Sequence, residues 1–147
     1  MSLSQVTGYQ LTRANIAGLA SYARDIERVF DLRPVEYTIL QLVREGQCTT
    51  PSQLAKELSI TPPSMSVWLD KLSERKLLAR SKSALDGRAS QVQLTTAGLK
   101  LITQAHEALL KSEQRLLAPL SAGERVMLLE ILNKLCEKQP VPVIGPA

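Results

Sequence analysis

The chain has 147 residues, of which 44% are hydrophobic and only 3% aromatic, so we expect one domain whose core is built from leucine, isoleucine, valine and alanine. Eighteen basic and 14 acidic residues give a formal charge of +4. Two cysteines and one histidine are too few for a disulfide framework or a zinc site, and no cofactor is expected. Because the sequence contains neither a membrane-length apolar run nor a secretion signal, we expect a cytoplasmic protein.

The N-terminal third predicts two helices. Apolar side chains, among them Tyr22, Ile26 and Phe30, recur at helical spacing within residues 8–30 and predict an amphipathic helix. Pro34 interrupts that pattern and is suited to the first turn of a second helix, which ends near Gly46.

Two short helices are predicted next. Residues 50–53 (Thr-Pro-Ser-Gln) combine a Thr N-cap, a Pro at the first helical position and a Gln that completes a capping box. A second helix begins at Thr61 and Pro62 and places Met65, Trp68, Leu69 and Leu72 on one face. Two short helices joined by a tight turn are typical of a helix-turn-helix, whose second helix enters the major groove of DNA.

The hydrophobic period changes after Leu77. Residues 78–82 and 90–94 alternate apolar and polar side chains, and Asp86-Gly87 supplies a turn between them, which predicts a hairpin with Val92 and Leu94 facing inward. Residues 62–88 contain six basic and three acidic side chains, which is most of the excess positive charge of the chain. A local positive field of this kind attracts phosphate.

The C-terminal third predicts two more helices. Thr95 or Thr96 caps a long helix with near coiled-coil spacing, which ends at Pro119, and residues 121–124 (Ser-Ala-Gly-Glu) form a capping box that begins the last helix. The proline-rich tail, residues 139–147, is expected to be flexible. The terminal helices are too apolar for a monomer, which favours a homodimer that places two units on successive major grooves of a palindrome.

These elements resemble the MarR family of winged helix-turn-helix transcription regulators over roughly residues 32–135. The motifs that carry the resemblance are residues 53–58, Leu72, and residues 77–80, 86–88 and 94–98. The resemblance implies a mainly α fold with a small β-hairpin wing and with N- and C-terminal dimerisation helices. It implies a single MarR-like domain over residues 1–147, with a DNA-binding unit at 32–98 and dimerisation helices at 8–31 and 99–138.

The resemblance also implies roles for individual residues. Asp86 would position the wing loop and Arg88 would enter the minor groove, where a planar cation suits a narrow electronegative site; the alternative for both is a solvated turn with a local ion pair. The recognition helix would begin at Pro62 and present to the bases Pro63, Ser64, Ser66 and Val67. The residues that would bind or attract backbone phosphate are Ser52, Gln53, Lys71, Arg75 and Arg80.

Two positions depart from the family pattern. Val67 stands where many members have a basic residue, so it can offer only an apolar contact, for instance to a thymine methyl group. Lys76 replaces the usual glycine at the end of the recognition helix, so either this position is left-handed at about 1 kcal/mol relative to glycine or the helix ends differently.

Family members often bind small aromatic acids or related metabolites between the dimerisation helices and the winged unit. The candidates for such a pocket are Tyr22, Tyr37, Trp68 and His106, with ordinary packing as the alternative for each. Arg13, Arg24 and Arg28 could pair with an anionic effector, but Asp25 and Glu27 are equally available to them. Neither Cys48 nor Cys136 lies where some relatives sense oxidants, so redox sensing is not expected.

The function indicated is a sequence-specific DNA-binding transcriptional regulator. The resemblance implies a ligand-responsive repressor that binds a palindromic operator on double-stranded DNA as a homodimer and is released by a small aromatic acid or related anionic metabolite. A winged-helix module that binds protein instead of DNA is the alternative. An enzyme is not expected, because the sequence has no nucleophile–base constellation, glycine-rich phosphate loop or metal-ligand spacing.

Overall fold

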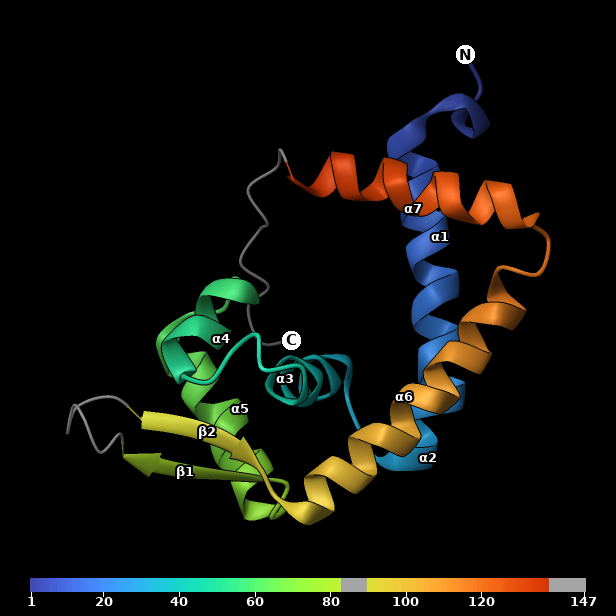
Figure 1. The fold of residues 1–147 in the computed structure, drawn as a ribbon. Helices are drawn as coiled ribbons and strands as arrows, with labels where there is room; N and C mark the ends of the chain where they lie inside the picture. Colours follow the sequence, from blue (N-terminus) through green and yellow to red (C-terminus); the bar gives the residue numbers. More distant parts are fainter. Residues whose placement is uncertain (83–89, 138–147) are drawn as a thin grey trace.

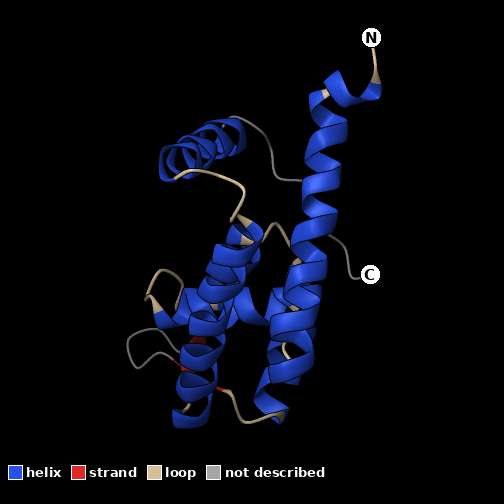
Figure 2. Ribbon diagram, turned by 90° about the vertical axis from the view of Figure 1, so that its right-hand side faces the viewer, coloured by secondary structure: helices blue, strands red, loops and turns tan. Residues whose placement is uncertain are grey.

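The computed structural model describes residues 1–82 and 90–137, which form helices and one two-stranded sheet (Figures 1 and 2). The predicted wing tip with Asp86 and Arg88, and the predicted tail, lie outside the described residues. None of the helices in the described ranges has the length and hydropathy needed to cross a membrane.

The N-terminal helix is continuous but not uniform. A short 3-10 turn, Leu3–Gln5, precedes α1 (Thr7–Tyr22), which continues through a π-helical turn, Ala23–Glu27, into α2 (Arg28–Phe30). The helix ends at Asp31, whose backbone is left-handed with φ of 50°. The helix predicted over residues 8–30 is confirmed, and the π-helical turn inside it was not predicted.

The next three helices are α3 (Pro34–Arg44), α4 (Pro51–Glu57) and α5 (Pro62–Glu74), and each begins at the predicted proline. The predicted capping box before α4 is present: Thr50 Oγ1 accepts the Gln53 amide at 3.2 Å, and Gln53 Oε1 accepts the Thr50 amide at 3.2 Å. Thr61 caps α5 by accepting the Ser64 amide at 3.4 Å. These caps satisfy backbone N–H groups that a helix start leaves unpaired.

The predicted hairpin is confirmed as β1 (Leu78–Lys82) and β2 (Ser90–Leu94), an antiparallel pair with Leu78 opposite Leu94. Val92 is buried, and its amide donates to the Thr49 carbonyl at 2.8 Å. The hairpin is therefore attached to the loop that precedes α4, beside the helix-turn-helix (Figure 1).

The core lies inside the winged unit and at its junction with the long helices. Its largest fully buried apolar side chains come from the π-helical turn, the loop before α3, and α3, α4, α5, β2 and α6, and they are aliphatic: Ile26, Leu32, Ile39, Leu40, Leu54, Met65, Leu69, Leu72, Val92 and Ile102. The aromatic residues Tyr22, Phe30, Tyr37 and Trp68 pack at its margin, half-buried. The aliphatic core follows the low aromatic content of the sequence.

The C-terminal helices are α6 (Thr96–Leu116) and α7 (Ala122–Glu137). Thr95 is the N-cap of α6, which decides between the two predicted candidates. The two predicted C-terminal helices are confirmed, and α1 packs along α6. Figure 2 shows α7 standing apart from α1, and no residue of α7 is buried within the described chain.

Candidate nucleic-acid interface

The first two turns of α5 have one buried face and one exposed face. Met65 and Leu69 point into the core, whereas Pro63, Ser66 and Val67 are exposed, Val67 by 52%. Ser64 is half-buried and serves the helix cap, because its hydroxyl accepts a hydrogen bond from Thr61 Oγ1 at 3.0 Å. Of the four side chains predicted to face the bases, three are therefore exposed and one is used within the protein.

Ser52 and Gln53 lie in the first turn of α4, and both are exposed. Gln53 Oε1 accepts the amides of Thr49 at 2.9 Å and of Thr50 at 3.2 Å. The capping box thus fixes this side chain through its oxygen and leaves its amide nitrogen outside the cap.

The structure gives Arg80 intramolecular partners that the sequence did not predict. Arg80 Nη2 lies 3.3 Å from Asp70 Oδ1 and 3.2 Å from the Ser66 carbonyl oxygen. Arg80 therefore joins β1 to the exposed face of α5. Lys71 is exposed, with its ammonium group 4.9 Å from the centre of the Trp68 ring.

Arg75 also has internal partners. Its Nη1 lies 3.3 Å from Glu36 Oε1, and its Nη2 lies 3.8 Å from Asp31 Oδ2. Glu36 is buried, and its Oε2 accepts the Arg33 amide at 2.8 Å. Glu36 was missed as a candidate, although an acidic residue two positions after the first-turn proline is a helix-start signal that could have found its amide contact.

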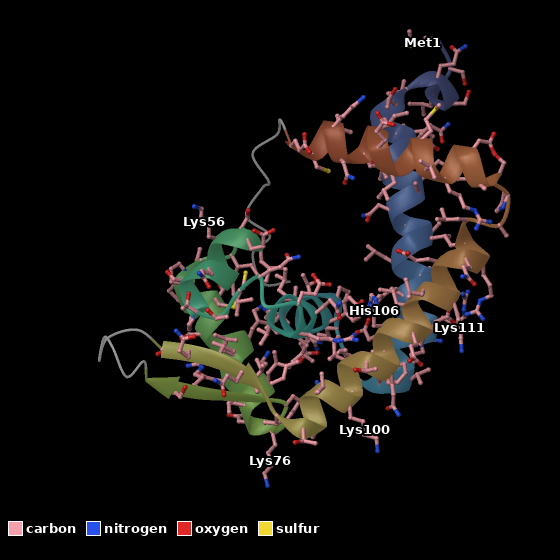
Figure 3. All side chains as sticks on the ribbon, viewed as in Figure 1. Met1, Lys56, Lys76, Lys100, His106 and Lys111 are labelled. Atoms are coloured by element: carbon pink, nitrogen blue, oxygen red, sulfur yellow. The ribbon has the colours of Figure 1, made fainter. Side chains whose placement is uncertain are left out.

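Of the two alternatives for the end of α5, the structure has the one with a strained, left-handed Lys76. Lys76 is left-handed with φ of 58°, and the Leu77 amide donates to the Leu72 carbonyl at 3.0 Å. This bond, together with that from the Lys76 amide to the Ser73 carbonyl, forms a Schellman motif, which normally favours glycine. Figure 3 shows the Lys76 side chain pointing away from the molecule.

A cavity of about 330 Å³ lies between the N-terminal helix, α3 and α6. Tyr22 and Tyr37 line it with their rings edge to face, 6.1 Å apart, and its apolar walls include Leu109 and Leu116. His106, on α6 (Figure 3), has its Nδ1 2.6 Å from the Tyr37 hydroxyl oxygen. Of the four predicted pocket residues, three are close together, whereas Trp68 lines a different cavity with Lys71 and Arg75.

Both tyrosines of this cavity stay protonated at neutral pH. Burial, followed by the nearby charge of Glu113, raises the pKa of Tyr37 to about 12. Burial and then Tyr37 raise the pKa of Tyr22 well above its usual value, and the Tyr22 hydroxyl donates to the Leu32 carbonyl at 2.9 Å. The cavity therefore presents neutral phenols among apolar side chains and polar ones, which include Ser112 and Glu113.

Asp25 in the π-helical turn forms a polar cluster with α6. Its carboxylate accepts hydrogen bonds from Arg24 at 2.8 Å, Arg115 at 2.8 Å and the Ser112 hydroxyl, whose oxygen lies 2.8 Å from that of Ser21. The Arg24 hydrogen bond, and then those from Ser112 and Arg115, hold the pKa of Asp25 well below its usual range. For Arg24 the structure supports the protein-internal alternative; Arg13 donates to Gln10 at 3.4 Å.

The two thiols lie in different surroundings. Cys48 is buried, which raises its pKa and disfavours the reactive thiolate, and Cys136 is exposed on α7. Within residues 1–82 and 90–137, no three His, Cys, Asp or Glu side chains gather as a metal site would require.

A helix-turn-helix followed by a β-hairpin, with an exposed second helix, defines the winged-helix class of DNA-binding proteins. The MarR family model matches residues 32–90, from Leu32 to the start of β2. The winged unit therefore matches the MarR family, and the chain is a DNA-binding transcriptional regulator with the predicted winged helix-turn-helix fold class.

Two proteins similar to this chain illustrate the match. The transcriptional regulatory protein for the hcr operon of Thauera aromatica is 27% identical over 134 residues, which cover 91% of this chain and 81% of that protein. The transcriptional repressor CouR, solved on a 23-mer DNA duplex, is 26% identical, with a TM-score of 0.83 over 91% of this chain and 94% of CouR.

One further structure supports the fold alone. BpsR of Bordetella bronchiseptica is 24% identical and has a TM-score of 0.84, covering 95% of this chain and 99% of BpsR.

Proposed function

We propose that this chain is a ligand-responsive repressor that binds a palindromic operator as a homodimer. The observation that carries the proposal is the pairing of an exposed recognition-helix start with terminal helices whose apolar side chains are uncovered within one chain. The domain is residues 1–147, with residues 32–98 as the DNA-binding unit and residues 8–31 and 99–138 as dimerisation helices. As a regulator of operator DNA, the protein acts in the cytoplasm.

The homodimer is supported by the exposed apolar surface of α1 and α7. In α7, Val126 is 70% exposed, Met127 62% and Leu129 62%, and in α1, Ile16 is 62% exposed. Large apolar side chains at this density are typical of a protein interface rather than of a solvated helix. A second copy covers them through the same surface and sets two recognition helices about one DNA turn apart.

DNA recognition would use the start of α5 and the wing. Pro62, Pro63, Ser66 and Val67 lie where base edges would be met, Ser64 caps the helix behind them, and Ser52, Gln53 and Lys71 lie where phosphate would be met. Arg80 and Arg75 contribute to the positive field, but each is paired with an acidic side chain. Their main role would be to position other groups. Asp86 and Arg88 keep the roles that the family resemblance gives them, at the wing tip and in the minor groove.

An effector would bind in the cavity of Tyr22 and Tyr37, with His106 orienting Tyr37. Aromatic walls and neutral hydroxyl groups suit a small aromatic acid or a related metabolite. BpsR, a protein of the same fold, has its DNA binding regulated by 6-hydroxynicotinic acid. The effector releases the operator if it binds more tightly to a dimer conformation in which the spacing of the two winged units does not fit the duplex.

Operator binding measured against salt concentration tests the proposal. The affinity of the wild-type protein should fall steeply as salt rises, because several phosphate contacts release counterions, and Arg88→Ala should weaken binding while the dimer persists in sedimentation. A flat salt response would instead indicate a protein-binding module. Benzoate and hydroxybenzoates, added singly, should release the operator from the wild type and from Tyr9→Ala but not from Tyr37→Ala.

A further inference from the structure

The exposed face of α5 carries an unusual set of side chains for a helix that enters DNA. Its members recur at spacings of three and four residues, and they are Pro63, Ser66, Val67, Asp70, Lys71 and Glu74. Lys71 is the one cation among them, and it lies over the Trp68 ring. The first two turns of this face contain no charged side chain before Asp70, so they offer no Arg or Lys to a guanine.

The start of α5 also lacks the backbone donors that most helix starts offer to phosphate. Pro62 and Pro63 have no N–H group, and the Ser64 amide donates to Thr61 Oγ1 at 3.4 Å. The Met65 amide, next in the chain, donates to the Thr61 carbonyl at 2.9 Å. Of the three N–H groups that residues 62–64 would normally leave open in this first turn, two are therefore missing and one is used.

Two acceptors on this face, the Ser66 carbonyl and the Asp70 carboxylate, are also engaged within the protein. Arg80 donates a hydrogen bond to the Ser66 carbonyl oxygen at 3.2 Å and forms an ion pair with the Asp70 carboxylate at 3.3 Å. Glu74, one turn beyond Asp70 and Lys71, is acidic and would be repelled by phosphate. The end of the helix that fits the groove is thus the apolar pair Pro63 and Val67, which stand one turn apart.

We propose that Val67 determines sequence specificity by packing against the 5-methyl group of a thymine in each operator half-site. The thymine methyl is the one apolar group that base pairs present in the major groove, and an exposed valine on an uncharged helix start is its chemical complement. This inference rests on the proposed function, because it assigns the base that the same DNA-binding surface reads.

The test begins with operators selected from random duplexes by the wild-type protein. Each thymine of the selected site is then replaced singly by deoxyuridine, which removes the methyl group and keeps all base-pair hydrogen bonds. We expect one symmetry-related thymine per half-site at which the replacement weakens binding about fourfold, the value of one buried methyl group. Val67→Ala should bind thymine and uracil duplexes equally at that position.

Glu74→Ala is the control, because Glu74 is exposed on the same face but lies beyond the turns that would enter the groove, and it should retain the wild-type preference for thymine. Thermal unfolding of Val67→Ala verifies the fold, which an exposed position should leave unchanged. The inference is overturned if every deoxyuridine site binds as thymine does, or if Val67→Ala keeps the preference. If no duplex is selected, the proposed function fails as well, so the two failures are distinguishable.

Discussion

Arg75 at the end of the recognition helix lies 3.3 Å from the buried carboxylate of Glu36 in the first turn of α3. The residue after Glu36 is Tyr37, which lines the cavity between the long helices. The ion pair therefore joins the end of α5 to the part of α3 that would meet an effector. A predicted phosphate contact is here also a link inside the protein.

Arg75→Ala should lower the free energy of unfolding by about 2 kcal/mol, because it leaves the Glu36 carboxylate buried with one partner fewer. Urea denaturation measures this loss. Arg80→Ala is the control: the carboxylate of Asp70 is 64% exposed, so breaking that pair should change stability by about 1 kcal/mol or less. Equal losses of unfolding free energy in the two variants would show that the buried pair with Glu36 stabilises the fold no more than the exposed pair does.

Asp25→Asn should flatten the acid dependence of stability. The donors around Asp25 lower its folded-state pKa below the unfolded value of about 3.9. Its stabilising contribution is therefore complete at neutral pH and declines as the pH falls below about 5 toward the lowered pKa. Urea midpoints of wild type and variant should differ at neutral pH and converge in acid, whereas a constant difference would contradict this role.

Lys76→Gly should raise the free energy of unfolding by about 1 kcal/mol, because glycine adopts a left-handed conformation without the Cβ clash. The Lys76 side chain points away from the molecule, so its removal loses no packing (Figure 3). Lys76→Ala removes the same side chain but retains a Cβ, and it should not be stabilised. Thermal or urea unfolding of the three proteins makes the comparison, and a gain for Ala equal to that for Gly would refute it.

Gly98→Ala should be destabilised by about 3 kcal/mol, since the added Cβ would lie only 2.0 Å from the Leu77 carbonyl oxygen, a backbone atom that cannot rotate away. Gly18→Ala is the matched control. A Cβ at Gly18 meets nothing within 4 Å inside α1, so it should raise stability by about 0.5 kcal/mol through helix propensity. Equal changes in stability for the two variants, measured by calorimetric unfolding, would contradict the close contact at Gly98.

Much of the fold could be predicted because the ends of its helices and strands depend on residues that are close together in the sequence. Thr50, Thr61 and Thr95 each cap the helix that follows, and the prolines after the first two fix the helix starts. The hairpin was also predictable, since alternation and turn residues act over short distances. The MarR resemblance then supplied the order in which these pieces form a winged helix.

The features that were missed depend on residues far apart in the sequence. Arg75 and Glu36 are 39 residues apart, and Asp25 and Arg115 are 90 apart, so no local pattern pairs them. Trp68 shares a helical face with Met65, yet it lies at the margin of the core beside Lys71, away from Tyr22 and Tyr37. The π-helical turn was missed because no local pattern in the sequence marks it; its Asp25 contacts Ser112 of α6, 87 residues away.

The start of α6 is joined to the base of the wing by short backbone contacts. Thr95 Oγ1 donates to the Lys76 carbonyl at 2.6 Å, and the Thr95 amide donates to the Leu77 carbonyl at 3.1 Å, directly above Gly98. No flexible linker separates the winged unit from α6 here. We therefore expect a tilt of α6 near Ser112, toward its far end, to move the winged unit together with the helix.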